Sequence, residues 1–177
     1  PLALQEALPK KFILYLGIIN SERFLDKVIS AWRKDLPHLV IAGYGDEVDQ
    51  LKRLAHQQGK SDQIIWLGRI TPNLLPSITQ KAQLGLHLLD IASKNYRYSL
   101  ANKCFEYMHA GIPMLTVKTP IHELLYEKAT SDSKDDKEEP GKLKGKGDFE
   151  RNFNEAPCIQ NGYITFGSFG NFRKGLY

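Results

Sequence analysis

The stretch FILYLGIINSERFLDKVISAW, residues 12–32, contains the pattern that decides the fold. Its first five residues form an unbroken apolar run that ends at Gly17, which predicts a buried strand closed by a tight turn. Ser21 stands where it can cap a helix whose apolar residues recur every three or four positions. The stretch therefore predicts one strand–turn–helix unit.

The same unit recurs along the first two-thirds of the chain. Further apolar runs predict strands at residues 39–42, 64–67, 84–89 and 112–117. Helical patterns separate them, one opened by Asp46 as a cap, one by Pro72 and Asn73, and one over residues 100–110. Continuous apolar strands alternating with helices indicate a parallel sheet that is covered on both faces. The expected fold class is α/β, with a Rossmann-like sheet.

The character of the chain changes near residue 129. Residues 1–129 are expected to form the Rossmann-like domain, and the nearly all-polar residues 130–157 to form a disordered, flexible linker. A short apolar run at residues 163–166 predicts an isolated C-terminal strand, so residues 158–177 are interpreted as the fragment of a second unit.

Composition narrows the class of protein. Apolar residues make up 42% of 177 residues, which suits a folded core, and two distant cysteines give no disulfide framework. No secretory leader or membrane-length apolar run is seen, so a cytoplasmic protein is expected. The net charge is +4, and it lies before residue 130 because the tail is neutral. No dense basic stripe with interleaved aromatics appears, so nucleic acid is not expected as a partner.

The turn at Gly17 is the first candidate site. A strand ends there and a helix follows, so free amides and the helix dipole favour an anion. Arg23 lies six residues later and is placed to add a charge-assisted contact to phosphate. The alternative is an ordinary strand–helix turn with a solvated arginine.

A second glycine turn, Gly43-Tyr44-Gly45-Asp46-Glu47-Val48, has part of the dinucleotide-binding fingerprint. The third glycine is absent, the turn belongs to the second strand–helix unit, and the next strand ends without a carboxylate for a ribose. A tight turn is therefore the preferred interpretation, and a dehydrogenase is a distant third function.

The run Asn102-Lys103-Cys104-Phe105-Glu106 opens the predicted helix at residues 100–110. Packing explains its apolar members but requires no carboxylate there. Glu106 can accept both hydroxyls of a ribose, while Lys103 and free amides one turn earlier can hold a diphosphate. The alternative is a solvated Lys103–Glu106 pair, which contributes only about 0.2–0.5 kcal/mol.

The five histidines are scattered along the chain: His38, His56, His87, His109 and His122. Their spacing shows no metal-binding pair, so they are interpreted as packing or surface residues. No metal and no cofactor are expected.

The segment NYRYSLANKCFEYMHAGIPM, residues 95–114, resembles the donor-site signature of family 4 glycosyltransferases, and the likeness extends over residues 10–127. The resemblance implies the C-terminal, nucleotide-sugar-binding half of a two-domain GT-B enzyme of polysaccharide or glycoconjugate biosynthesis. It implies metal-independent transfer, with the nucleotide sugar as substrate. The acceptor-binding domain is expected to lie outside this chain. Peripheral membrane association through that acceptor-binding half is therefore compatible with the resemblance.

The same resemblance assigns roles to residues. Glu106 matches the glutamate that holds the ribose, and Arg23 matches the diphosphate-binding cation. The other expected contacts to the nucleotide sugar come from strand ends and from the start of the motif helix: Gly17, Arg69, Ile70, Ser99, Leu100, Ala101, Asn102 and Lys103. No catalytic residue is assigned.

Two positions depart from the family's pattern. Tyr98 stands where the family's first glutamate would be, and Ile18 replaces an arginine that often follows the first glycine. These departures favour the alternative function, a non-catalytic Rossmann-like module that scaffolds a partner glycosyltransferase.

The tail resembles a second family. Residues 156–171, APCIQNGYITFGSFGN, are similar to the start of the donor domain in O-GlcNAc transferase-like proteins. The resemblance implies that a second GT-B unit begins there, and the alternative is a stray strand with a polar loop.

Overall fold

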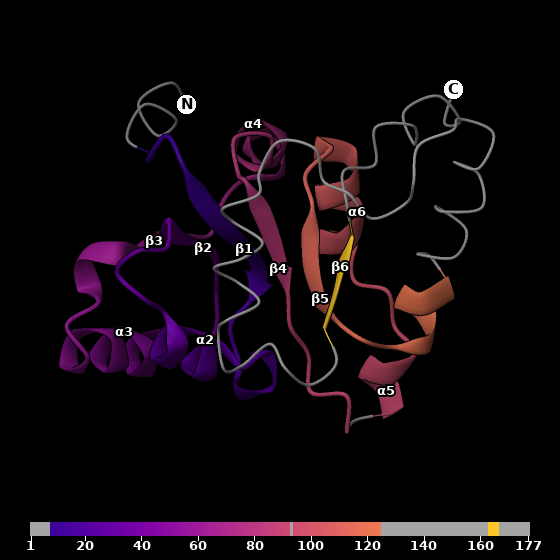
Figure 1. Cartoon of the computed structure of the whole chain (residues 1–177), viewed down its shortest axis with the longest axis horizontal. Coiled ribbons are helices and arrows are strands. Elements are labelled where there is room, and N and C mark those ends of the chain that lie inside the picture. The colour runs from indigo at the N-terminus through magenta and orange to yellow at the C-terminus, as the bar shows by residue number, and fades with distance from the viewer. Residues whose placement is uncertain (1–7, 93, 125–162, 167–177) are drawn as a thin grey trace.

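The computed structural model describes residues 8–92, 94–124 and 163–166, and they form one sheet with helices on both faces (Figure 1). The strands are β1 (Phe12–Ile18), β2 (His38–Tyr44), β3 (Ile64–Gly68), β4 (Leu84–His87), β5 (Met114–Val117) and β6 (Tyr163–Phe166). Their order is β3-β2-β1-β4-β5-β6. The first five are parallel, and β6 pairs antiparallel with β5. The predicted α/β, Rossmann-like fold is confirmed.

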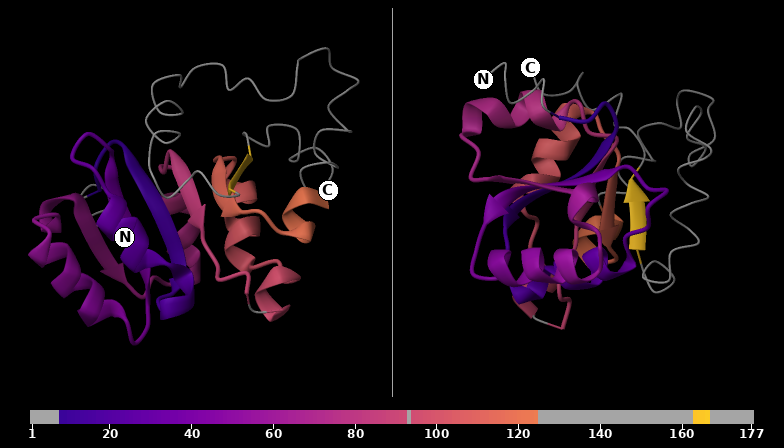
Figure 2. Two further views of the ribbon diagram at one scale, coloured as in Figure 1. Left: turned by 60° about the horizontal axis from the view of Figure 1, so that its bottom comes forward. Right: turned by 90° about the vertical axis from the view of Figure 1, so that its left-hand side faces the viewer.

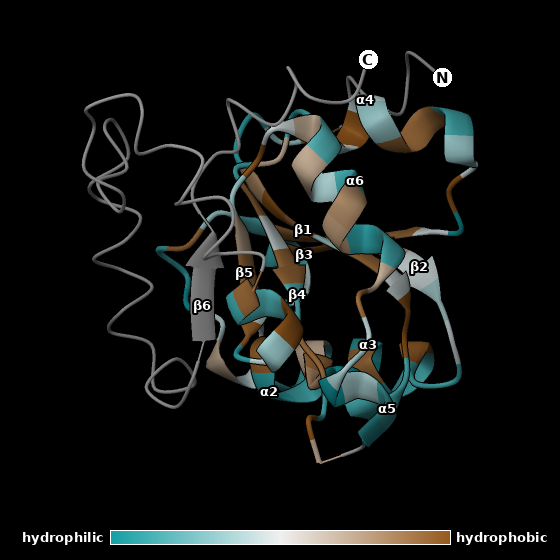
Figure 3. Ribbon diagram, turned by 90° about the vertical axis from the view of Figure 1, so that its right-hand side faces the viewer, coloured by the Kyte–Doolittle hydropathy of each residue, from teal (hydrophilic) through white to brown (hydrophobic). Residues whose placement is uncertain are grey.

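Alternate residues of β1 point to the two faces of the sheet. Ile13 and Tyr15 belong to one apolar cluster, with residues of α2 (Leu25–Ala31) and α3 (Val48–Gln57). Leu14 and Leu16 belong to the other, with residues of α4 (Leu75–Thr79) and α6 (Asn102–Ala110). Figure 2 and Figure 3 show these two helical layers on opposite sides of the strands. Burial on both faces is why the strands are apolar throughout.

Short elements complete the described chain. They are α5 (Lys94–Arg97) and the 3₁₀ turns η1 (Ser21–Arg23), η2 (Ser61–Gln63) and η3 (Pro72–Leu74). None of the helices in these residue ranges is long and apolar enough to cross a membrane.

Two predicted helix caps are wrong. Ser21 begins η1 rather than capping an α-helix, and α2 starts only after Phe24, which has a left-handed backbone with φ of 53°. Asp46 does not cap α3, whose preceding residue is Glu47 and which has no side-chain cap bond. Arg23 therefore lies in a 3₁₀ turn and not in the first turn of an α-helix.

The predicted C-terminal strand is present. The sequence had suggested an isolated strand, and this is wrong. Met114 to Val117 of β5 pair in register with Phe166 to Tyr163 of β6. The open main-chain groups of an edge strand favour such pairing. The predicted linker at residues 130–157 lies outside the described residues.

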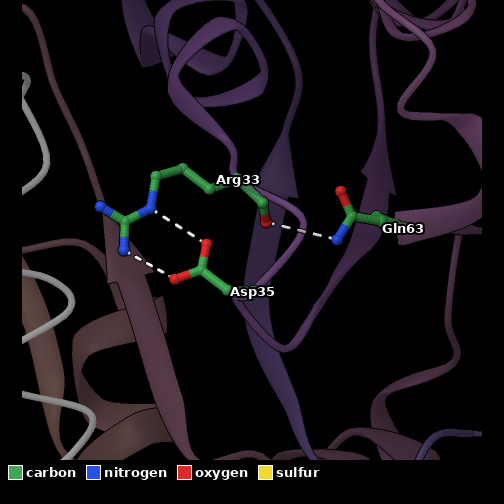
Figure 4. A network of polar contacts seen from close by, with 3 residues as sticks. All are labelled: Arg33, Asp35 and Gln63. Atoms are coloured by element: carbon green, nitrogen blue, oxygen red, sulfur yellow. Dashed lines mark hydrogen bonds and ion pairs between the residues drawn. The ribbon is translucent and has the colours of Figure 1, made fainter.

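A polar network ties the connection between α2 and β2 to the turn that precedes β3 (Figure 4). Arg33 and Asp35 form a two-pronged ion pair at 2.7 and 3.1 Å, and Gln63 Nε2 donates to the Arg33 carbonyl at 3.3 Å. The hydrogen bonds from Arg33 hold the pKa of Asp35 below its usual value. This network lies at the amino end of the strands, and in it the Arg33 cation is paired with the Asp35 carboxylate.

Candidate functional site

The carboxyl ends of β1 and β4 lie side by side where the strand order reverses. From β1 the chain proceeds to β2 and β3 on one side and then to β4 and β5 on the other. Open α/β sheets bind ligands at such a switch point, because the two following connections diverge there. Both candidate segments, the Gly17 turn and the start of α6, follow these two strands.

The turn at Gly17 depends on two glycines. Gly17 has a φ of 119°, which side-chain-bearing residues rarely adopt. Gly43 is its partner on β2, and a Cβ there would lie 1.8 Å from the Gly17 carbonyl oxygen. Gly43, the first glycine of the partial dinucleotide-binding fingerprint, is thus required because β1 and β2 approach each other closely at this point.

Tyr107 fixes α6 over the switch point. Its buried hydroxyl accepts from the Leu16 amide at 3.1 Å and directs its proton toward the Leu14 and Leu86 carbonyls, each at 3.2 Å. The ring lies against Gly85, where a Cβ would come within 2.6 Å of ring atoms. One tyrosine therefore joins α6 to both β1 and β4 and sets where the helix begins.

Lys103 lies one helical turn before Tyr107 and reaches the end of β1. Its Nζ lies 4.0 Å from the centre of the Tyr15 ring, and it would be 3.3 Å from a Cβ placed on Gly17. The residue as a whole is partly exposed, but its Nζ is buried and has no hydrogen-bond partner among the residues that the structure describes. Burial, reinforced by the charge of Arg23, lowers the pKa of Lys103 to about 7.

Arg23 is the second cation at this edge. Its guanidinium lies 4.7 Å from the centre of the Tyr96 ring, and its Nε is buried without a hydrogen-bond partner. Tyr96 in turn donates to Glu22 at 2.5 Å, and the Asp90 amide donates to the Glu22 carbonyl at 2.9 Å. These contacts bring the connections that follow β1 and β4 together and hold Arg23 between them.

Ser99, Leu100 and Ala101 precede α6, which begins at Asn102 and not at Leu100 as predicted. Ala101 is the residue before the helix and makes no side-chain cap bond. The Ser99 amide already donates to the Tyr96 carbonyl, at 3.4 Å. The first amides of a helix have no partner within it, although the Cys104 amide in the first turn of α6 already donates to the Ala101 carbonyl at 2.9 Å. Asn102 is exposed at this end.

Glu106 is partly exposed on α6, and the alternative of a Lys103–Glu106 pair is not realised, since Lys103 Nζ has no partner. Arg69 follows β3 and stacks on the exposed Tyr44 ring at 4.2 Å, while Ile70 packs on the cluster that includes Val40. The structure thus brings Gly17, Arg23 and Lys103 together, whereas Arg69 and Ile70 follow β3, which β2 separates from β1.

The two departures from the family pattern are surface residues. Ile18 is 51% exposed at the end of β1, and Tyr98 is 62% exposed after α5.

Sequence reasoning missed several residues of this edge. The rings of Tyr15 and Tyr96 lie against the charged groups of Lys103 and Arg23. In the sequence, each tyrosine looks like an ordinary core or loop aromatic. His87, Cys104 and His122 also converge, with ligand atoms within 4.8 Å of one another. Their separations in sequence gave no metal-like spacing, because they belong to three different elements.

Comparison with known proteins follows this geometry. Residues 3–128 match the family model described as glycosyl transferases group 1. No curated protein matches the chain. Three solved structures share its fold at low identity. The catalytic domain of cholesterol-α-glucosyltransferase from Helicobacter pylori has a TM-score of 0.53 at 21% identity, covering 67% of this chain and 72% of that one.

The C-terminal domain of LpcC, a glycosyl transferase group 1 family protein from Francisella tularensis, has a TM-score of 0.52 at 19% identity, covering 75% and 81% of the two chains. HepE from Anabaena, solved with UDP and glucose, has a TM-score of 0.53 at 15% identity, covering 64% of this chain but only 31% of its own. The Rossmann-like fold is the one these GT-B glycosyltransferases contain. The match over residues 3–128 shows that the chain belongs to the glycosyl transferases group 1 family.

Proposed function

We propose that this chain is the donor-binding half of a glycosyltransferase and holds a nucleoside-diphosphate sugar at the carboxyl edge of β1 and β4. The observation that supports this most is the pair of cationic side chains, Lys103 and Arg23, whose buried Nζ and Nε have no hydrogen-bond partner. Burying a charge without a partner is costly, so an anion that neutralises both would repay that cost.

A diphosphate fits the chemistry of this edge. It offers oxygens to Lys103 Nζ, to the Arg23 guanidinium and to the free amides at the start of α6. Glu106 lies three residues after Lys103 on α6 and accepts the ribose hydroxyls. Arg69 and Ile70, after β3, flank the base. The sugar then extends from the diphosphate toward an acceptor held by another domain.

In this proposal the protein promotes transfer by orientation and by stabilising the leaving diphosphate. The positive charges of Lys103 and Arg23 interact more strongly with the phosphates as negative charge builds on the leaving group. The transfer is metal-independent, as the resemblance to family 4 implies. Membership of that family, a cytoplasmic location and the second unit suggested for residues 158–177 remain predictions.

Titration with UDP, GDP and ADP tests donor binding, read by the rise in melting temperature and by calorimetry. Lys103→Met and Arg23→Met each remove a charge-assisted contact that contributes about 1.5–3 kcal/mol, so the Kd should weaken about 10- to 100-fold. Lys34→Met and Arg53→Met are matched controls, because both side chains are exposed and lie on other parts of the surface.

The variant Glu106→Ala tests the contact to the ribose separately from the contacts to the phosphates. It should weaken UDP binding and leave binding of inorganic pyrophosphate unchanged, whereas Lys103→Met should weaken both. If no nucleotide stabilises the wild-type chain, donor binding is refuted and the non-catalytic scaffold becomes the better account.

A further inference from the structure

Three metal-binding side chains meet in the interior between β4, α6 and the segment that follows β5. His87 ends β4, Cys104 lies in the first turn of α6, and His122 lies in a helical segment that begins at Pro120. All three are fully buried. Their ligand atoms lie within 4.8 Å of one another, although the residues are 17 and 18 positions apart in the chain.

The cluster has the dimensions of a metal site that needs only small adjustments. Cys104 Sγ lies 3.8 Å from His122 Nε2, and a tetrahedral zinc ion would place bound sulfur and nitrogen roughly 3.5 Å apart. The His87 and His122 rings are 5.1 Å apart between centroids and inclined at 70°. A shared ion would require the His87 ring to move toward the other two side chains, since the ligand atoms now lie within 4.8 Å of one another.

His122 is oriented by its own local structure. Thr119 precedes the helical segment, and its Oγ1 accepts from the His122 amide at 3.3 Å and contacts His122 Nδ1 at 2.7 Å. Pro120 occupies the first helical position, which suits a residue without an N–H. With Nδ1 held by Thr119, the Nε2 atom faces Cys104, an arrangement that resembles the outer-shell support of metal-bound histidines.

His87 supplies the independent sign of a missing ligand. Both of its ring nitrogens are buried without a hydrogen-bond partner in the structure. Leaving a buried polar group unpaired costs about 1–3 kcal/mol, so two on one ring call for an explanation. If His87 only filled space in the core, an apolar side chain such as leucine would do so without leaving polar atoms unpaired.

Burial shifts the pKa of all three side chains. Burial lowers the pKa of His87 to about 2, helped by the charges of Lys103, His122 and Arg23, and burial lowers the pKa of His122 to about 4. Both imidazoles are therefore neutral near pH 7. Burial raises the pKa of Cys104 to about 12, so the thiol keeps its proton until a metal displaces it.

We propose that His87, Cys104 and His122 bind one thiophilic d¹⁰ metal ion, Zn²⁺ or Cu⁺, in a buried structural site next to the donor edge. On binding, a metal–sulfur bond forms, the thiol proton passes to solvent, and nothing is oxidised or reduced. Two imidazoles and a thiolate are the ligands that such ions prefer.

The ion would join β4, the start of α6 and the segment after β5. It takes no part in sugar transfer, which agrees with a metal-independent reaction. The thiolate charge offsets part of the repulsion between the ion and the nearby Lys103 and Arg23. Its effect on the protein is to fix the position of α6, on which Lys103 and Glu106 lie.

The test uses the full chain, stripped of metal with a chelator and then titrated with Zn²⁺ in competition with a chromogenic chelator. One equivalent should bind and raise the melting temperature. Co²⁺ serves as a spectroscopic probe, since coordination by Cys104 produces a thiolate-to-cobalt absorption band. Cu⁺ under anaerobic, reducing conditions is the second probe, and binding of either ion through Cys104 supports the site.

Cys104→Ser and His87→Asn should each weaken binding by more than about 100-fold, the upper range for losing an outer-shell partner. Circular dichroism of the metal-free variants checks that they fold. Cys158→Ala and His56→Asn, which alter the other cysteine and an exposed histidine, should bind as the wild type does. Absence of the cobalt band with no uptake of Zn²⁺ or Cu⁺ by the folded wild type would overturn the proposal, as would full binding by Cys104→Ser.

Discussion

Lys103 shows how one residue can serve a ligand at the expense of the fold. The residue as a whole is partly exposed while its ammonium is buried against the Tyr15 ring, whereas lysine usually keeps its ammonium in water. The contact with the ring recovers part of the desolvation cost, since cation–π attraction contributes about 0.5–2 kcal/mol. The remainder destabilises the protein until an anion binds.

Lys103→Met should therefore stabilise the chain while weakening nucleotide binding. The amine titrates at 10.5 when unperturbed and at about 7 in the fold, and each pKa unit corresponds to about 1.4 kcal/mol. Between these values the unfolded chain binds more protons, so wild-type stability rises with pH. Below about pH 7 both states are protonated and the cost is fully present.

The free energy of unfolding of Lys103→Met should thus exceed that of the wild type by a few kcal/mol near pH 6, and this difference should shrink toward about pH 10. Urea unfolding of both proteins across this range, in buffer with a chelator, measures it. A methionine variant that is less stable than the wild type at every pH would contradict this account of Lys103.

At the scale of elements, the position of α6 depends on Tyr107. The sequence motif made this residue look like one of several apolar positions of a helix. In the fold its hydroxyl satisfies the Leu16 amide and approaches carbonyls of both β1 and β4. Burial raises the pKa of Tyr107, so the hydroxyl remains protonated and can act as donor and acceptor at once.

Tyr107→Phe keeps the ring but leaves the Leu16 amide without its acceptor. The free energy of unfolding should fall by about 1–3 kcal/mol, the cost of an unsatisfied buried group. Chemical denaturation measures the change, and Tyr44→Phe is the control because that ring is 50% exposed. Equal stability of Tyr107→Phe and wild type would show that α6 is held by packing alone.

At the scale of the molecule, the proposed function makes this chain one side of a larger site at the carboxyl edge of β1 and β4. Ile18, at the end of β1, and Tyr98, after α5, are both exposed. In the proposed function a second domain supplies the acceptor and closes this edge against water.

The 177-residue chain alone should bind UDP but release little UDP from a nucleotide sugar. Transfer requires an acceptor oriented against the sugar, and orientation accounts for much of the rate of such reactions. The measurement is UDP release from UDP-glucose, with and without a simple glycoside acceptor. Turnover well above the uncatalysed rate would refute the requirement for a second domain.

The sequence by itself determined the succession of strands and helices along the chain and the glycine turn after β1. It also predicted the motif helix, although it placed the start at Leu100 and α6 begins at Asn102. Those features follow from local periodicity and from residues with restricted backbone choices, which neighbours in the chain are enough to decide. The helix caps at Ser21 and Asp46 were predicted wrongly, because a left-handed Phe24 and packing of the turns onto the sheet overrode local capping preferences.

Only the tertiary structure decided which polar groups meet. Lys103 reaches Tyr15 across 88 residues of sequence, Arg23 meets Tyr96, and His87 joins Cys104 and His122. Each contact is set by the order in which the strands lie in the sheet. That order depends on packing of both faces at once, and no local pattern in the sequence records it.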